Sequence, residues 1–240
     1  MLETVPQQIT RLDQIGRPVS KFVFLAIGLG AALVLFSSAF LTSFIISIVC
    51  FAFAAALATR GLMLNYPHPS LGWCNVVTLL RVALVAFLIG AIFDPVISVW
   101  VTFVVATIAF ALDGADGWLA RRDGMTSFFG SSFDMETDAA LGAVLALGLL
   151  IQGNVGLEIL VLGCMRYLFV AGSLFVPALR GDLPESYRRK AICVVQIVAL
   201  IILLCPLTPV SFLMPISIIA AALLVWSFAV DTLWLLRPSV

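Results

Sequence analysis

Four aspartates at helical spacing are the residues of this 240-residue sequence that are best suited to chemistry. Residues 113–138 read DGADGWLARRDGMTSFFGSSFDMETD. Asp113 and Asp116 stand at i and i+3, and Asp134 and Asp138 at i and i+4, so each pair lies on one face of a helix. The chain is 62% hydrophobic. Ionisable side chains at membrane depth are costly and mark a functional site by default.

Carboxylates grouped in this way predict binding of hard divalent cations, which prefer oxygen ligands. A pair of Mg²⁺ or Mn²⁺ ions suits displacement at phosphorus, because it stabilises both the attacking and the leaving oxygen. Gly117, Ala120 and Gly130 leave space beside the acids, and Arg121 can offset the charge of a phosphate. The pattern therefore predicts a pocket with two metal ions, whose candidate ligands are Asp113, Asp116, Asp134 and Asp138.

The composition predicts helices in a membrane as the elements that carry these residues. Mean hydropathy is +1.18 and 11% of the residues are charged. A membrane-spanning helix needs about 20 mostly apolar residues. Eight segments qualify: 22–37, 39–58, 72–93, 96–115, 133–152, 155–179, 190–206 and 210–235. We expect a polar N-terminal lead over 1–21 that is no removable signal peptide, a transmembrane hairpin over 22–60 and a six-span catalytic domain over 61–240.

The basic residues predict the orientation of these spans. The loops near Ser38, Asp94, Gly153 and Leu207 hold no lysine or arginine. The opposite span ends hold Arg11, Arg17, Lys21, Arg60, Arg121, Arg122, Arg180, Arg188, Arg189, Lys190 and Arg237. Because basic residues are retained on the cytoplasmic side, both termini and the aspartates are expected to face the cytoplasm.

The aspartate stretch resembles the motif of the CDP-alcohol phosphatidyltransferases, DxxDGxxAR followed by eight residues and GxxxDxxxD, and every fixed position matches. The resemblance covers the six-span block. It implies a six-helix membrane bundle, usually dimeric, that transfers a phosphatidyl group from CDP-diacylglycerol to an alcohol and releases CMP. We therefore expect an all-α integral membrane protein with that bundle and an extra N-terminal transmembrane hairpin, about eight spans in all. The expected setting is a bacterial inner membrane, with membrane lipids, a second copy of the chain and no nucleic acid as partners.

The resemblance also implies a role for each motif residue. The metals would be held by Asp113, Asp116 and Asp134, and Asp138 would lie beside them as the general base. The CDP moiety would be held by Gly117, Ala120 and Arg121.

A second family pattern, Asn-x-x-Thr-x-x-Arg, is matched by Asn75, Thr78 and Arg81 at the start of the third span. In the family these residues would help to hold the nucleotide diphosphate. The alternative is structural: Asn75 caps the helix and Arg81 extends its charge towards the membrane surface. The lone histidine, His68, lies in a proline-rich loop and is not expected to be catalytic.

Four more basic residues bear on the alcohol acceptor: Arg166, Arg188, Arg189 and Lys190. Arg166 lies inside the sixth span and needs an anionic partner, which is one of the aspartates, another structural group or a substrate phosphate. The other three either anchor the seventh span at the cytoplasmic surface or bind a phosphorylated acceptor, such as glycerol 3-phosphate or an inositol phosphate.

Other features leave the acceptor open. Lys190 and Gln196 loosely fit a pattern of family members that make phosphatidylglycerophosphate. Those members commonly follow the last aspartate with lysine, whereas this chain has Ala139. Serine or another neutral headgroup alcohol therefore stays open.

Two other classes of protein are weighed against the enzyme. An ion-coupled transporter would use intramembrane acids, but it predicts inverted repeats and broken helices near the midplane. The sequence shows no convincing repeat, and its acids gather at one side. A structural membrane protein with an inactive site is disfavoured by the intact motif.

Overall fold

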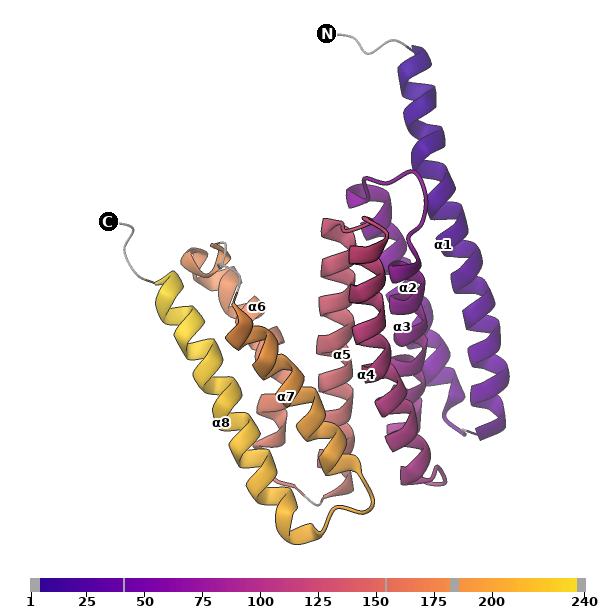
Figure 1. The fold of residues 1–240 in the computed structure, drawn as a ribbon. Coiled ribbons are helices and arrows are strands. Elements are labelled where there is room, and N and C mark those ends of the chain that lie inside the picture. The colour runs from indigo at the N-terminus through magenta and orange to yellow at the C-terminus, as the bar shows by residue number, and fades with distance from the viewer. Residues whose placement is uncertain (1–4, 41, 154, 182–185, 237–240) are drawn as a thin grey trace. The chain divides into compact units, whose positions relative to one another are not determined.

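The computed structural model describes residues 5–40, 42–153, 155–181 and 186–236, with side chains from residue 16 onward except that of Arg180. Arg237 and the side chains of Arg11 and Arg180, used above to orient the spans, lie outside this description. The described residues form eight α-helices and one short 3₁₀ helix (Figure 1). They are α1 (Val5–Phe40), α2 (Phe44–Asn65), α3 (Trp73–Ile92), α4 (Val99–Arg122), α5 (Phe128–Gln152), α6 (Ile159–Phe175), η1 (Pro177–Arg180), α7 (Tyr187–Leu204) and α8 (Val210–Leu235).

Each predicted span falls mainly on one of these helices, but the first turn lies later than expected. The predicted break at Ser37 and Ser38 is helical, and α1 continues to Phe40. The Ser38 hydroxyl donates to the carbonyl of Leu35, so this serine is accommodated within the helix. As a result the second span begins at Phe44 instead of residue 39.

The helices confirm an all-α integral membrane protein. Within the described part of the chain, five segments are long and apolar enough to cross a bilayer: Gly16–Phe40, Phe44–Asn65, Trp73–Ile92, Val99–Arg122 and Val210–Leu235. The helix α6 is apolar but has only 17 residues. Large apolar side chains such as Phe24 and Leu35 are exposed on α1, as expected of a surface that faces lipid.

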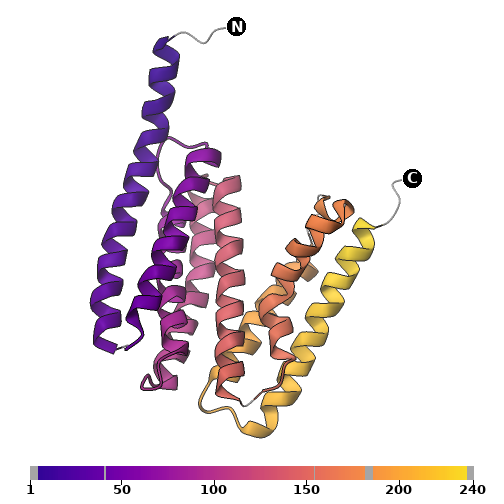
Figure 2. The same ribbon diagram turned by 180° about the vertical axis from the view of Figure 1, so that it is seen from behind.

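The chain divides into two compact units. The first comprises residues 1–97 and 104–138, and the second comprises residues 98–103 and 139–240. In the first unit α1 and α2 form an antiparallel pair that packs against α3, and the N-terminal part of α1 projects beyond the end of α2 (Figures 1 and 2). All four motif aspartates belong to the first unit.

Asp94 joins two loops of the first unit. Its carboxylate accepts hydrogen bonds from the backbone N–H groups of Thr42, Ser43 and Val96, and from the Thr42 hydroxyl at 2.7 Å. These contacts lower the pKa of Asp94 to about 2, chiefly through the Thr42 hydroxyl. The turn between α1 and α2 is thereby fixed to the loop between α3 and α4.

The second unit packs α6 and α7 against α8. Small residues of α5 receive α6: a Cβ atom on Gly163 would lie 2.7 Å from Cβ of Ala146 and 3.1 Å from Cα of Ala143. The side-chain amide of Gln196 on α7 donates to the carbonyl of Leu162. The small-residue face of α5 is thus used for helix packing within the chain.

Candidate active site

Arg81 of α3 extends among the four motif aspartates. Its Nη1 atom lies 3.1 Å from Oδ1 of Asp113, 3.0 Å from Oδ2 of Asp116 and 2.5 Å from Oδ1 of Asp134. Its Nη2 atom pairs with Asp138. One guanidinium thus faces four carboxylates, so three formal negative charges are left for other cations to balance.

Burial makes the centre of this cluster electrostatically demanding. The side chains of Arg81 and Asp116 are 1% and 3% exposed, whereas that of Asp138 is 39% exposed. Arg81 Nε also donates to the carbonyl of Ala109 at 3.1 Å, which fixes the guanidinium against α4. The Thr78 hydroxyl lies 3.1 Å from Oδ2 of Asp116. The cluster therefore runs from a buried Arg81–Asp116 pair to a more accessible Asp138.

The carboxylates fit a hard divalent cation. One carboxylate oxygen from each of Asp113, Asp116 and Asp134 lies within 4.8 Å of the others. Oδ1 of Asp116 is buried and has no hydrogen-bond partner among the described residues. Because an unpaired buried carboxylate oxygen is costly, this atom favours a cation as its partner.

A cavity of about 160 Å³ adjoins the cluster. Its walls come from α3, α4, the loop between α4 and α5, and the start of α5. They comprise Cys74, Asn75, Thr78, Asp116, Gly117, Ala120, Arg121, Met125, Thr126, Ser127, Gly130, Ser131 and Asp134. Two metal candidates, Asp116 and Asp134, therefore border the same space as the residues that the motif assigns to the CDP moiety.

Glycines shape this cavity. Gly124, two residues after the end of α4, has a φ of 63°, a conformation that L side chains rarely adopt, and lets the chain turn into the following loop. At Gly130 a Cβ atom would lie 3.1 Å from Ser127 Oγ and 3.2 Å from Asn75 Oδ1. The Ser127 hydroxyl accepts from the backbone N–H of Gly130 at 3.0 Å. Gly130 thus lets α3 and α5 approach closely at the cavity wall.

Several cavity residues are absent from the sequence-based prediction. Met125, Thr126, Ser127 and Ser131 line the cavity but lie between the fixed positions of the motif. The run of hydroxyl residues around Gly130 was the available signal, because such side chains commonly contact polar ligands.

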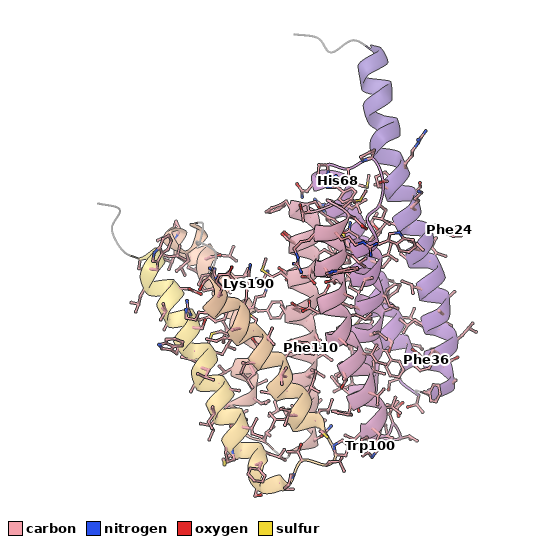
Figure 3. All side chains as sticks on the ribbon, viewed as in Figure 1. Phe24, Phe36, His68, Trp100, Phe110 and Lys190 are labelled. Atoms are coloured by element: carbon pink, nitrogen blue, oxygen red, sulfur yellow. The ribbon has the colours of Figure 1, made fainter. Side chains whose placement is uncertain are left out.

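The basic residues proposed for the acceptor all belong to the second unit. Arg166 lies half-buried on α6. Arg188 donates to Asp231 at 2.5 Å and to the hydroxyl and carbonyl of Ser227, and Arg189 lies 3.8 Å from Asp231. Arg188 therefore links α7 to α8. Lys190, labelled in Figure 3, follows these two arginines on α7.

Comparison with known proteins agrees with the motif. The profile of the CDP-alcohol phosphatidyltransferase family matches residues 72–233, which include every motif position and leave out α1 and α2. The "Probable phosphatidylglycerophosphate synthase" of Mycobacterium tuberculosis, in strains CDC 1551 / Oshkosh and ATCC 25618 / H37Rv, is 31% identical over 157 residues. That alignment covers 62% of this chain and 74% of the relative. No solved structure gives a significant match.

Proposed function

Because the chain belongs to the CDP-alcohol phosphatidyltransferase family, we propose that it transfers a phosphatidyl group from CDP-diacylglycerol to a phosphorylated alcohol. The observation that carries this proposal is the convergence of three carboxylates beside a cavity whose wall also holds the motif residues Gly117, Ala120, Arg121 and Gly130. Asp113, Asp116 and Asp134 would hold Mg²⁺ or Mn²⁺, with Asp138 beside them. The bound ions would supply charge stabilisation for the phosphate oxygens.

The residues then divide the reaction between them. Asp138, the most exposed of the four acids, takes the proton from the acceptor hydroxyl. The acceptor oxygen forms a bond to the β-phosphorus, which carries diacylglycerol, and the bond from that phosphorus to the oxygen of CMP breaks. Arg121, on the cavity wall, balances negative charge on the diphosphate.

The nucleotide moiety is proposed to occupy the cavity. Gly117 and Ala120 leave its α4 wall open, and Asn75 and Thr78 line its α3 wall. Arg81 pairs with the acids beside this cavity, and this pairing supports their arrangement.

A phosphorylated acceptor is favoured by two observations. The relative is named "Probable phosphatidylglycerophosphate synthase", and the headgroup of phosphatidylglycerophosphate carries a phosphate. This chain also carries Arg166, Arg188, Arg189 and Lys190, a group of cations suited to a phosphate. Arg188 contacts Asp231, and Arg166 and Lys190 are the two residues of this group that we propose to replace in the test.

The remaining proposals concern setting and assembly. We propose that residues 61–240 form the catalytic domain and that the enzyme is a homodimer. We also propose that both termini and the active site lie at the cytoplasmic face of a bacterial inner membrane. The clustering of basic residues at one set of span ends supports the orientation. The diacylglycerol chains could then stay in the bilayer during headgroup transfer.

An acceptor screen tests the function. Purified full-length protein receives labelled CDP-diacylglycerol, Mn²⁺ or Mg²⁺, and one alcohol at a time from a panel of glycerol 3-phosphate, inositol phosphate, inositol, serine and glycerol. We expect lipid product with a phosphorylated alcohol. Efficient transfer only to an unphosphorylated alcohol would contradict the acceptor assignment and leave the family assignment intact.

Two variants refine the screen. Loss of a charge-assisted contact of about 1.5–3 kcal/mol corresponds to a roughly ten- to a hundredfold weaker interaction. Arg166→Ala and Lys190→Ala are each expected to raise the acceptor KM by such a factor, with little change in the KM for CDP-diacylglycerol. Equal changes in both KM values would indicate a structural role.

A further inference from the structure

The N-terminal hairpin, α1 and α2, lies outside the matched family region, yet it contacts the helix that carries two of the acids. Phe22 of α1 is fully buried, and its ring meets the edge of Phe133, with centroids 6.1 Å apart. Phe133 immediately precedes Asp134. The hairpin thus touches α5 beside a candidate metal ligand.

A second contact adjoins Gly130. The ring of Phe129 is 4% exposed and stacks on Phe133, with centroids 5.5 Å apart. Tyr66, the C-cap residue of α2, meets Phe129 edge-on, with ring centroids 5.9 Å apart. At Gly61 of α2, a Cβ atom would lie 3.3 Å from two carbons of the Phe129 ring, so the missing side chain lets this ring sit against α2. We call Phe22, Tyr66, Phe129 and Phe133 the aromatic brace.

The loop after α2 contacts the other walls of the site. The Tyr66 hydroxyl accepts from the backbone N–H of Gly72, the N-cap residue of α3, at 3.0 Å. His68 Nε2 lies 3.0 Å from the carbonyl oxygen of Thr126, which lines the cavity. The hairpin and its loop therefore contact α3, the loop between α4 and α5, and α5.

These contacts constrain the rotation of α5. Phe129 and Phe133 stand at i and i+4 and share one face, as do Asp134 and Asp138. Rotation of α5 would move both pairs together, and it would break the contacts of Phe133 with Phe22 and of Phe129 with Tyr66. We propose that the hairpin fixes the rotation of α5 through the aromatic brace. In this proposal Phe22 and Tyr66 are positioning residues that hold the α5 acids in the geometry for metal binding.

The inference rests on the proposed metal-dependent function, and its test compares two buried phenylalanines of the hairpin. Phe22→Ala removes the contact with α5. The control, Phe51→Ala, removes a ring that is 4% exposed and packs near Gly30 between α1 and α2. Phe22→Leu restores most of the lost volume. Each full-length variant is measured for its melting temperature in chelator, for Mn²⁺ affinity by electron paramagnetic resonance, and for hydrogen exchange of residues 128–138.

Loss of a residue that orients metal ligands typically weakens metal binding about 10–100-fold. We expect Phe22→Ala to weaken Mn²⁺ binding by that factor and to speed exchange in residues 128–138. Phe22→Leu should recover most of the affinity. Phe51→Ala should change neither measurement in this region, even with a similar loss of melting temperature. Equal effects of Phe22→Ala and Phe51→Ala on Mn²⁺ affinity and on exchange of residues 128–138 would overturn the proposal that the hairpin positions α5.

The exchange measurement separates this inference from the proposed function. If the wild-type protein binds no Mn²⁺, the metal-dependent function is contradicted. The hydrogen-exchange measurement alone would then test whether the hairpin positions α5. Faster exchange of residues 128–138 specific to Phe22→Ala would still support it. Unchanged exchange in this segment would refute it.

Discussion

Nη1 of Arg81 lies 3.0 Å from Oδ2 of Asp116, and both side chains are almost completely buried. A buried ion pair offsets its cost of desolvation only when both partners are present. Arg81 therefore stabilises the acidic cluster, and its charge falls short of balancing the four carboxylates. Divalent cations would complete the balance.

Replacement of Arg81 should expose this dependence. In chelator, Arg81→Met is expected to cost about 3–5 kcal/mol, because it leaves Asp116 buried without its partner. Mn²⁺ should return more stability to this variant than to wild type, since the cation then takes over the missing charge. Arg81→Lys, which keeps a charge and loses the planar fork, should fall between the two. Melting temperatures with and without Mn²⁺ provide the measurement, and an identical Mn²⁺ effect in all three proteins would argue against this reading.

The α5 acids should separate into two roles. Asp134→Asn is expected to lose both Mn²⁺ affinity and activity, because it removes a charged metal ligand. Asp138→Asn should lower turnover by roughly 10²–10⁴-fold, the range of general-base catalysis, while largely keeping CDP-diacylglycerol binding. Single-turnover kinetics and a binding assay on the same preparations distinguish these outcomes. An active Asp138→Asn enzyme would remove this residue from proton transfer.

The stability of the first unit should depend on pH through the ionisation of Asp94. Its folded pKa is about 2, below its ordinary value of 3.8, so the ionised form is favoured in the folded protein. The stabilisation is then complete above the ordinary value and is lost as pH falls towards about 2. Asp94→Asn should melt below wild type at neutral pH, and the difference should shrink in this acidic window. Asp123→Asn, a change at an exposed acid, serves as the control. A difference in melting temperature between wild type and Asp94→Asn that stays constant down to pH 2 would contradict the lowered pKa of Asp94.

The orientation can be tested at the two ends of α4. In a background without the five native cysteines, a cysteine at Asp123 should react with a membrane-impermeant reagent from the cytoplasmic side. One at Val96, which is exposed in the loop before α4, should react from the other side. The basic residues Arg121 and Arg122 at the end of α4 are the reason for this expectation. Reversed labelling would overturn the cytoplasmic placement of the site.

The sequence predicted the fold class and the family, and both are confirmed. Long apolar runs dictate membrane helices. The i, i+3 spacing of Asp113 and Asp116 places them on one face of α4, where they meet Asp134. Family membership also favours an enzyme over an ion-coupled transporter.

Contacts between segments that are distant in the chain could not be predicted from the sequence. The role of Arg81 at the diphosphate stays a prediction. Its contacts with the acids could not be predicted, because a long side chain can reach several anions and the choice depends on how α3 and α4 meet. The contact of Phe22 with Phe133 joins residues more than a hundred positions apart. Nothing in the sequence distinguishes these two phenylalanines from the many apolar residues that face lipid. The assigned site roles stay predictions.

Release of CMP is the measurement that tests the central claim most directly. Purified full-length protein in lipid nanodiscs is given CDP-diacylglycerol labelled in the cytidine, together with the acceptor identified by the screen. We predict that CMP and lipid product form in equal amounts, that excess chelator stops both, and that Mg²⁺ or Mn²⁺ restores both. Undiminished CMP release in excess chelator would contradict the account, as would failure to release CMP with either metal and every acceptor of the panel.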